Sequence, residues 1–230
     1  HEWKRPSRVH APDLSIPERW NARRKPWRGS ATWRYLRDER DIPEAILRSA
    51  ITQDILREGP RGSMWAAHRD RAGAVTGWEE RGPDWRGFAT GGAKVLFRLG
   101  PVDGPRLCVA EAAIDAMSLA ALEDQRPDTR YLSTGGGWSP ASSEALLDLA
   151  VRADALLVAA TDNNAQGETF AERLEALAAD AGCGFVRLRP ELEDWNEDLK
   201  AKRRNKDGRE EEKDSCPMPA VRLKGEAPPG

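Results

Sequence analysis

The chain has 230 residues, of which 32% are charged and 39% hydrophobic, and its formal net charge is −2. No window approaches the roughly 18 to 20 consecutive apolar residues of a membrane helix, and no charged start leads into an apolar core as in a signal peptide. We therefore expect a cytoplasmic protein with no membrane partner and, since the sequence starts at His1, a segment of a longer chain. Its three cysteines and three histidines are dispersed, which argues against a disulfide framework or a zinc site.

The near-neutral total conceals three regions of different charge. Residues 1–100 carry 20 basic and 13 acidic side chains, a net +7, together with seven of the nine tryptophans. Residues 101–199 carry 7 basic and 19 acidic side chains, a net −12, and residues 200–230 carry 9 and 6, a net +3. Arginine interleaved with tryptophan in the first region predicts single-stranded nucleic-acid binding by phosphate contacts and base stacking. The alternative is that these tryptophans pack in the core.

The first region divides into an arm and a small domain. Residues 1–29 are rich in proline, arginine and tryptophan, which predicts an extended arm. Residues 30–104 are predicted to form an α+β domain, in which Ser30 can cap one helix and Pro43 suits the first turn of a second. The expected elements of this domain are helices at 31–40 and 44–50, a β-hairpin turning at 70–73, and short strands at 87–92 and 94–100.

Residues 105–204 alternate short apolar segments with amphipathic ones, four times over. The pattern predicts an α/β domain with a four-stranded, mainly parallel, Rossmann-like sheet and helices on both faces. Residues 205–230 are charged and proline-rich, which predicts a disordered tail. The expected strands are 106–111, 130–134, 155–161 and 184–190, and the expected helices are 112–124, 140–153, 166–182 and 192–204.

Acidic residues fall where three of the predicted strands end. Glu111 ends the first strand, Asp162 ends the third, and Asp194 lies just past the fourth. Ligands of an open parallel sheet bind at this carboxyl edge. Converging carboxylates suit Mg²⁺ or Mn²⁺, because the cation offsets their mutual repulsion. Asp115 lies one helical turn after Glu111 and is expected on the same face.

Each of these acids also has an ordinary structural explanation. The alternatives are solvated carboxylates at Glu111 and Asp115, turn residues at Asp162, Asn164 and Gly167, and a helix N-cap at Asp194. In the last case Glu197 would complete a capping box.

Basic residues of the small domain and a glycine run at the end of the second strand are expected to contact nucleic acid. The glycines would let a phosphate backbone approach closely. These residues are Arg81, Arg86, Lys94, Gly135, Gly136 and Gly137.

The segments around the acids resemble the Toprim domain, the catalytic domain shared by bacterial primases, topoisomerases and small nucleases. The resemblance rests on VAEAAIDAMSLAAL, LLVAATDNNAQGETFAERL and LEDWNEDL. It implies that Glu111 acts as general acid/base and that Asp162 ligates a metal at the first position of a DxD motif. Asp194 matches the later acid of the family.

Two positions depart from the Toprim pattern. Asn164 occupies the second DxD position, where its amide oxygen can still ligate a metal without contributing charge, and Ala112 follows the glutamate where the family usually has glycine. The implied metal set is therefore Glu111, Asp162, Asn164 and Asp194. Asp115 is expected to act in catalysis by orienting a metal-bound water or a neighbouring side chain.

The residues before this part are similar to the segment that precedes Toprim in bacterial primases. The similarity rests on YLRDERDIPEAIL, DRAGAVTGWEERG and KVLFRLG, while DWNE is closer to Toprim-like proteins of plasmids and other mobile elements. The resemblance covers roughly residues 30–200. It implies a Mg²⁺-dependent, primase-like nucleotidyltransferase in plasmid or mobile-element replication or mobilisation. Its partners would be single-stranded DNA, nucleotides, and helicase or relaxase domains of a longer chain.

Two other functions stay open, a Toprim nuclease and a catalytically inactive nucleic-acid-binding module. The lost charge at Asn164 weakens metal binding and favours the second. A topoisomerase needs a transesterifying tyrosine, and neither Tyr35 nor Tyr131 has a supporting context.

Overall fold

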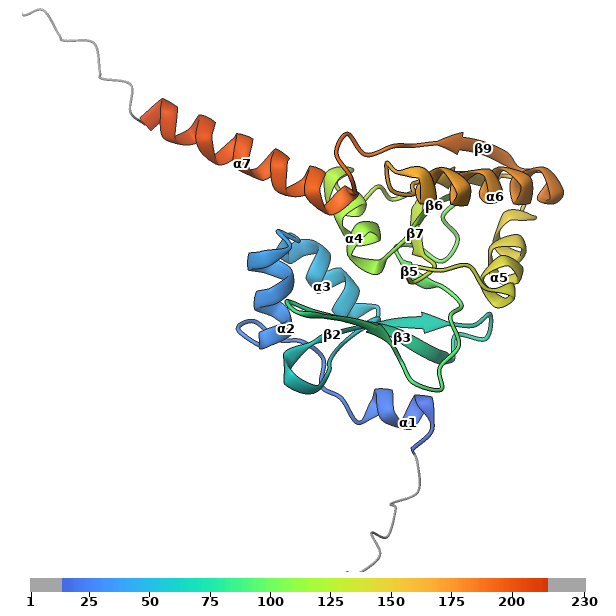
Figure 1. The fold of residues 1–230 in the computed structure, drawn as a ribbon, viewed down its shortest axis with the longest axis horizontal. Helices are drawn as coiled ribbons and strands as arrows, with labels where there is room; N and C mark the ends of the chain where they lie inside the picture. The colour runs from blue at the N-terminus through green and yellow to red at the C-terminus, as the bar shows by residue number, and fades with distance from the viewer. Residues whose placement is uncertain (1–13, 215–230) are drawn as a thin grey trace, which may run out of the picture.

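A computed structural model describes residues 14–214, and two β-sheets form its centre (Figure 1). The first sheet is antiparallel and runs in the order β1-β2-β3-β4. Its strands are β1 (Leu56–Glu58), β2 (Met64–Arg69), β3 (Val75–Gly82) and β4 (Trp85–Phe88). The helices that accompany it are α1 (Ile16–Asn21), α2 (Ala31–Arg34), η1, a π-helix (Tyr35–Glu39), α3 (Glu44–Thr52) and η2, a 3-10 turn (Pro60–Gly62).

The predicted extended arm at 1–29 is wrong for residues 16–21, which form α1, whereas residues 22–29 form neither helix nor strand. Ser15 and Glu18 form a capping box that starts α1, and Pro17 occupies the first turn, where a proline fits a helix. Trp20 is 1% exposed and its ring centroid lies 6.1 Å from that of Trp78 on β3. Burial of this tryptophan therefore fixes α1 against the first sheet. Residues 1–13 of the arm lie outside the described residues.

The rest of the small domain largely follows the prediction, with changes in one helix and one strand. The helix expected at 31–40 begins at Ala31 under the Ser30 cap, but it continues as a π-helix from Tyr35. The helix after Pro43 and the β2–β3 hairpin with its turn at 70–74 are present as expected. The strand expected at 87–92 lies slightly earlier, at Trp85–Phe88.

Most tryptophans of the basic region pack inside the protein. Trp65 and Trp78 stack with ring centroids 4.0 Å apart, and both are buried, as are Trp20 and Trp33. Arginines cover these rings from outside; the guanidinium of Arg57, for example, lies 4.9 Å from the ring centroid of Trp20. The base-stacking prediction is therefore wrong for these four tryptophans, and core packing explains them.

The second sheet carries the predicted β/α repeats and one additional strand. Its order is β5-β7-β6-β8-β9, parallel except for β5. The added edge strand β5 comes from the segment expected to belong to the small domain, because its Phe97 and Leu99 bury their side chains in the core beneath this sheet. The strands are β5 (Phe97–Leu99), β6 (Arg106–Ala110), β7 (Thr129–Ser133), β8 (Leu156–Ala159) and β9 (Gly184–Arg187).

Helices cover both faces of this sheet, as predicted for an α/β domain. On β6, Leu107 and Val109 contact the core under α5 and α6, whereas Cys108 and Ala110 contact the core that includes α4, α3 and α7. A strand buried on both faces is apolar throughout for this reason. The helices are α4 (Ala113–Leu122), α5 (Pro140–Ala150), α6 (Ala165–Ala181) and α7 (Trp195–Asp214).

The last helix is longer than expected. α7 continues to Asp214, past the predicted boundary at 204, and projects from the body of the molecule (Figure 1). Lysine, arginine and glutamate dominate this segment and are good helix formers. The remainder of the predicted tail, 215–230, lies outside the described residues. None of the described helices has the length and apolarity needed to cross a membrane.

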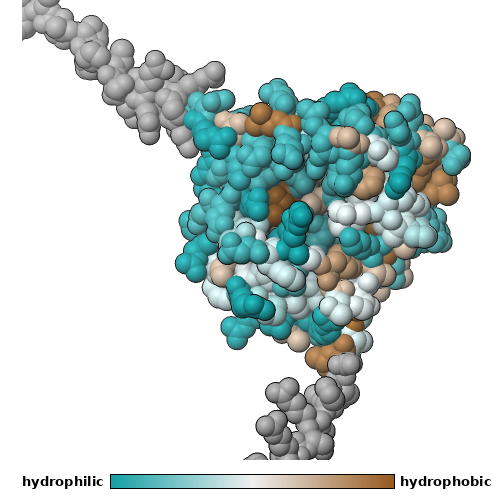
Figure 2. Space-filling view, viewed as in Figure 1, coloured by the Kyte–Doolittle hydropathy of each residue, from teal (hydrophilic) through white to brown (hydrophobic). Residues whose placement is uncertain are grey.

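One hydrophobic core joins the two sheets. It contains Leu47 of α3, Leu56 of β1 and Met64 of β2 together with Ile114 of α4 and Tyr131 of β7. The predicted boundary at residue 104 therefore does not separate the two sheets, because β5 lies before it and the sheets share a core. The face shown in Figure 2 is mostly hydrophilic with small separate apolar patches, which is ordinary for a folded surface.

Candidate active site

A cleft of about 600 Å³ lies between the two sheets, at the carboxyl edge of the parallel strands. Most residues predicted to form a site line it. Those lining the cleft are Glu111, Asp115, Asp162, Asp194, Arg81, Arg86, Lys94, Gly135 and Gly136, whereas Asn164 and Gly137 do not line it. The sequence therefore predicted a set of side chains that the fold brings together from both sheets.

Glu111 lies where three strand ends meet. It directly follows β6 and is 7% exposed. Its carboxylate accepts a 3.4 Å hydrogen bond from the backbone N–H of Asp162 and a 3.2 Å bond from Gln166 Nε2. Its backbone carbonyl accepts from the N–H of Gly136 at 2.7 Å. Burial raises the pKa of Glu111, although these donors and Arg187 partly oppose the rise.

Asp162 follows β8 and carries an oxygen with no partner. Its Oδ1 is buried without a hydrogen bond among the described residues. Burial, followed by the charges of Glu111, Asp194 and Glu193, raises the pKa of Asp162 to about 7. The Asp162 carboxylate is costly to ionise, and its Oδ1 accepts no hydrogen bond. A bound cation would offset the charge and give this oxygen a partner.

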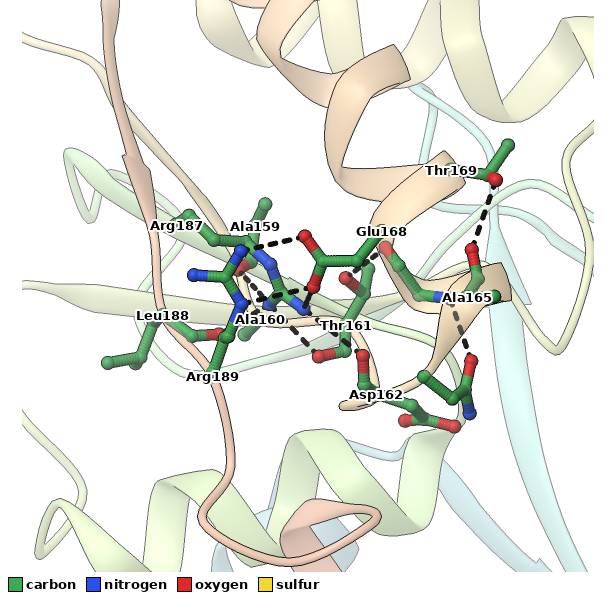
Figure 3. Close-up of polar contacts among 12 residues, drawn as sticks. Ala159, Ala160, Thr161, Asp162, Ala165, Glu168, Thr169, Arg187, Leu188 and Arg189 are labelled. Carbon is green, nitrogen blue, oxygen red and sulfur yellow. Dashed lines mark hydrogen bonds and ion pairs between the residues drawn. The ribbon is translucent and has the colours of Figure 1, made fainter.

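Arg187 of β9 holds the backbone of the Asp162 loop in place (Figure 3). Its Nη1 donates to the carbonyls of Ala159 and Thr161, both at 3.0 Å, and its Nη2 donates to the carbonyl of Asp162 at 3.1 Å. The guanidinium also pairs with Glu168 of α6 at 2.7 Å, and only 11% of the side chain is exposed. The buried guanidinium of Arg187 thus fixes the end of β8. Its positive charge also partly opposes the rise in the pKa values of Glu111 and Asp162.

Asp115 is a buried carboxylate on the first turn of α4. It is 7% exposed, and its Oδ1 has no hydrogen-bond partner among the described residues. Burial, then Asp194, Asp162 and Glu79, raise the pKa of Asp115 well above its usual range, while Arg81 opposes the rise. The alternative that Asp115 is a solvated carboxylate is therefore wrong, since its side chain is buried in the wall of the cleft.

The DWNE motif anchors α7 to the cleft. Asp194 caps this helix by accepting from the N–H of Glu197 at 2.8 Å, as the capping alternative predicted, and it also lines the cleft. Trp195 is buried, as expected for a packing residue, and donates from Nε1 to the carbonyl of Ala160 at 2.7 Å. Asn196 donates to the carbonyl of Arg40 at 2.7 Å. The motif thereby ties the end of β8 and the small domain to one helix.

Asn164 has a structural role in the turn after β8. Its Oδ1 accepts from the N–H of Gly167 at 2.9 Å and caps α6. A Cβ on Gly167 would lie 2.0 Å from the carbonyl oxygen of Asp162, so this position requires glycine. The turn interpretation thus accounts for both residues, and the oxygen expected to ligate a metal at Asn164 is already used by the helix.

The wall of the cleft that faces the acids is basic. Arg81 and Arg86 come from β3 and β4, and Lys94 donates from Nζ to the carbonyl of Gly135 at 2.8 Å. Gly135 and Gly136 both have positive φ, of 73° and 67°. Residues other than glycine rarely adopt a backbone conformation with positive φ. A Cβ on Gly135 would also lie 2.9 Å from the His68 ring. The glycine run therefore brings the backbone close to the cleft floor.

Residues 108–199 match the family model described as Toprim-like, and residues 34–104 match the family described as "Protein of unknown function (DUF3991)". Residues 108–199 form a Toprim-like domain. The expected resemblance is confirmed for this part of the chain. No curated protein matches the chain in sequence.

Solved primase structures share the fold. The zinc-binding and RNA polymerase domains of the Aquifex aeolicus primase align with a TM-score of 0.56 at 13% identity, over 86% of this chain and 61% of that one. The DnaG catalytic core aligns with a TM-score of 0.51 at 15% identity, over 78% of this chain and 71% of that one. The primase fragment of the bacteriophage T7 primase-helicase covers 70% and 65%, at 19% identity and a TM-score of 0.41. The chain thus spans less than two thirds of the Aquifex and T7 proteins.

The Toprim-like domain offers oxygen donors of the kind that a hard divalent cation takes. Unpartnered buried oxygens on Asp115 and Asp162 and the mutual repulsion of the carboxylates fit such a group. Within the described residues, however, no three histidine, cysteine, aspartate or glutamate side chains lie close enough together to hold a metal ion. The donor chemistry suits Mg²⁺ or Mn²⁺, but Glu111, Asp162 and Asp194 would have to move closer together to hold such an ion.

Glu79 is a cleft residue that the sequence interpretation missed. It is 3% exposed in the interior of β3 and lies 3.1 Å from His68 Nε2. Its other contacts are donors of the Toprim-like domain, Ser133 Oγ at 2.5 Å and the N–H of Ala113 at 2.9 Å. Burial favours a higher pKa for Glu79, but these hydrogen bonds outweigh it and lower the pKa.

A sequence signal for Glu79 existed in the strand period. It lies inside β3 between Trp78 and Glu80. Alternation places these two glutamates on opposite faces, so one of them had to face the interior.

Proposed function

We propose that the chain is a primase-like nucleotidyltransferase that uses Mg²⁺ or Mn²⁺ and acts on single-stranded DNA. The observation that carries this proposal is the cleft, in which an acidic wall of the Toprim-like domain faces a basic wall of the small domain. Nucleotidyl transfer depends on positioning and on neutralising phosphate charge. A bound divalent cation would supply Lewis-acid stabilisation of the reacting phosphate.

In this proposal the basic residues of the cleft bind phosphate groups, and the acidic residues hold the cation and transfer protons. Arg81, Arg86 and Lys94 bind the phosphates of template and nucleotide by charge-assisted hydrogen bonds. Asp162 and Asp194 hold the cation. Raised pKa values in a cleft mark candidates for proton transfer, and Glu111 takes this role as general acid/base.

Asp115 is a positioning residue in this scheme. It lies in the first turn of α4, and the negative charges of Asp162 and Asp194 are close enough to raise its pKa. With a cation bound, Asp115 orients water or a neighbouring side chain toward it. We place the enzyme in plasmid or mobile-element DNA replication or mobilisation, in the cytoplasm, next to helicase or relaxase domains of a longer chain.

The proposal is tested by oligonucleotide synthesis on single-stranded DNA with Mn²⁺, with strand cleavage measured side by side. We expect synthesis by the wild type and loss of at least a hundredfold in Glu111→Gln, which keeps the shape of the side chain. Glu172→Gln is the matched control, because Glu172 is exposed on α6. Synthesis that survives Glu111→Gln removes Glu111 from the reaction, and cleavage without synthesis indicates the nuclease alternative.

A catalytically inactive binding module is the second candidate. Two observations favour it, the use of Asn164 as a helix cap and the lack of a closed ligand set among the described residues. In that case the wild type retards single-stranded DNA at low salt with EDTA, and Mn²⁺ produces neither synthesis nor cleavage.

A further inference from the structure

Three arginines gather at the edge of the second sheet opposite the cleft. Arg98 lies on β5 and Arg130 at the start of β7, on the face that packs α5. Arg152 follows the end of α5. We call Arg98, Arg130 and Arg152 the amino-edge arginine cluster, because Arg130 starts β7 and Arg152 precedes β8, whereas Glu111 and Asp162 follow the carboxyl ends of their strands. Arg98 lies on the neighbouring strand β5, in register with Leu132.

The cluster is built into the fold and leaves donors unused. Arg130 is 7% exposed, and its Nη1 donates to the carbonyl of Val102 at 3.1 Å. Arg152 Nη2 donates to the carbonyl of Asp103 at 2.7 Å, so the same loop orients both guanidinium groups. The Nε atoms of Arg98 and Arg130 are buried without any hydrogen-bond partner among the described residues. Buried donors are normally satisfied, and leaving one unpaired costs free energy.

The cluster is only partly neutralised, by the charges of Asp70 and Asp148 near Arg98. Among the side chains that the structure describes, none of the three arginines takes part in an ion pair, whereas most other buried arginines do. The acids nearest Arg98 have other partners, since Asp70 accepts from the N–H of Ala74 and Asp148 pairs with Arg71. Burial, then the charges of Arg98 and Arg152, lower the pKa of Arg130 to about 10. The three groups thus remain cationic and repel one another.

We propose that the amino-edge arginine cluster is a binding site for a phosphate group. Guanidinium groups bind phosphate through planar pairs of N–H donors, and an anion bound at the accessible ends of these groups would offset their repulsion. The phosphate belongs either to a nucleic-acid backbone or to a free nucleotide or pyrophosphate. The site is separate from the cleft, so it does not depend on the proposed chemistry of Glu111 or Asp162.

The experiment measures phosphate binding with the divalent metal removed. Pyrophosphate is titrated by calorimetry, and a labelled single-stranded oligonucleotide by fluorescence anisotropy, both in EDTA. The test variant is Arg98→Gln with Arg152→Gln, which keeps the most buried member, Arg130. The control is Arg126→Gln, which removes one exposed charge from the same edge, where Arg126 pairs with Asp128.

We expect the double variant to bind on the order of tenfold more weakly, with the Arg126→Gln control like the wild type. If only the oligonucleotide is affected, the phosphate is a backbone phosphate, and the slope of log affinity against log salt falls by about one to two. If pyrophosphate is also affected, the site takes free phosphates.

Three outcomes overturn the proposal. The wild type binds neither probe, the double variant binds both probes as the wild type does, or the control loses as much affinity as the double variant. Should the double variant fail to fold, Arg152→Gln alone replaces it, because that side chain makes a single contact at the surface. A threefold or larger loss is then expected, and an unchanged affinity overturns the proposal.

Discussion

At the scale of single residues, the cleft places carboxylates where they are difficult to ionise. Asp162 has an unpartnered oxygen and three acidic neighbours, and its pKa of about 7 follows from burial and from their charges. The nearest compensating cation is Arg187, whose hydrogen bonds go mainly to backbone carbonyls. These carboxylates therefore lower the free energy of unfolding when no divalent cation is bound.

The first prediction concerns the pH dependence of stability without metal. The pKa of Asp162 is higher in the folded protein, about 7, than in the unfolded chain, about 4. Between these values the unfolded chain binds fewer protons, so this residue makes stability fall as pH rises from about 4 to about 7. In EDTA, Asp162→Asn should therefore be more stable than the wild type at pH 8, by on the order of 1 kcal/mol after solvent screening. Urea unfolding at pH 5 and pH 8 checks this, and an equal difference at both pH values contradicts it.

A second prediction concerns Arg187. Arg187→Gln removes a donor from the carbonyls of Ala159, Thr161 and Asp162 and leaves Glu168 without its buried partner. We expect the free energy of unfolding to fall by about 2–4 kcal/mol. Arg189→Gln is the matched control, because Arg189 is 54% exposed and shares only Glu168 with it. The control should lose less than about 1 kcal/mol. Equal losses in the two variants would show that the buried contacts of Arg187 carry no special weight.

At the scale of elements, the turn between β8 and α6 determines where Asp162 lies. Asn164 caps the helix, and Gly167 leaves room for the Asp162 carbonyl. This arrangement gives Asn164 a local function that does not require a metal. The second DxD position of the family pattern is thus part of the helix start in this chain.

Gly167→Ala provides the third prediction. In an ordinary helix this change stabilises by up to about 1 kcal/mol. Here the new Cβ would lie 2.0 Å from a backbone oxygen, so the loop must move and we expect a loss of about 1–3 kcal/mol. Thermal unfolding gives the sign directly, and a gain in stability contradicts the close approach.

Local patterns predicted most elements because the relevant signals lie within a few residues. Apolar runs, caps at Ser30 and Ser139, and Gly182 at the end of α6 are signals of this kind. Long-range packing was not visible in the same way. The placement of β5 in the second sheet and of Trp20 against Trp78 depends on which distant surface each apolar residue covers. The carboxyl-edge rule brought Glu111 and Asp162 together, but the strand period indicated only that Glu79 or Glu80 faces the interior. It did not show that the interior position lies next to these acids.

At the scale of the whole molecule, the charge asymmetry of the sequence becomes two facing walls. The basic small domain and the acidic Toprim-like domain meet across one cleft, and a shared hydrophobic core fixes them to each other. Glu79 adds a polar connection, since it reaches from β3 to the start of α4 and the end of β7.

The fourth prediction tests this connection. Glu79→Ala leaves His68, Ser133 and the N–H of Ala113 without their acceptor in a buried place, and we expect a loss of about 3 kcal/mol. Glu80→Ala is the control, because Glu80 lies on the opposite face of β3 and contacts Ser63. Chemical denaturation followed by tryptophan fluorescence measures both. A loss at Glu80 as large as that at Glu79 would contradict the special role of the buried carboxylate.

The most direct test of the account is a calorimetric titration of Mn²⁺ into the whole chain and into Asp162→Asn. The account predicts that the wild type binds Mn²⁺ and that Asp162→Asn binds at least tenfold more weakly, while the exposed-residue control Glu172→Gln binds like the wild type. No binding by the wild type, or equal binding by Asp162→Asn, would contradict the assignment of the cleft as a divalent-metal site.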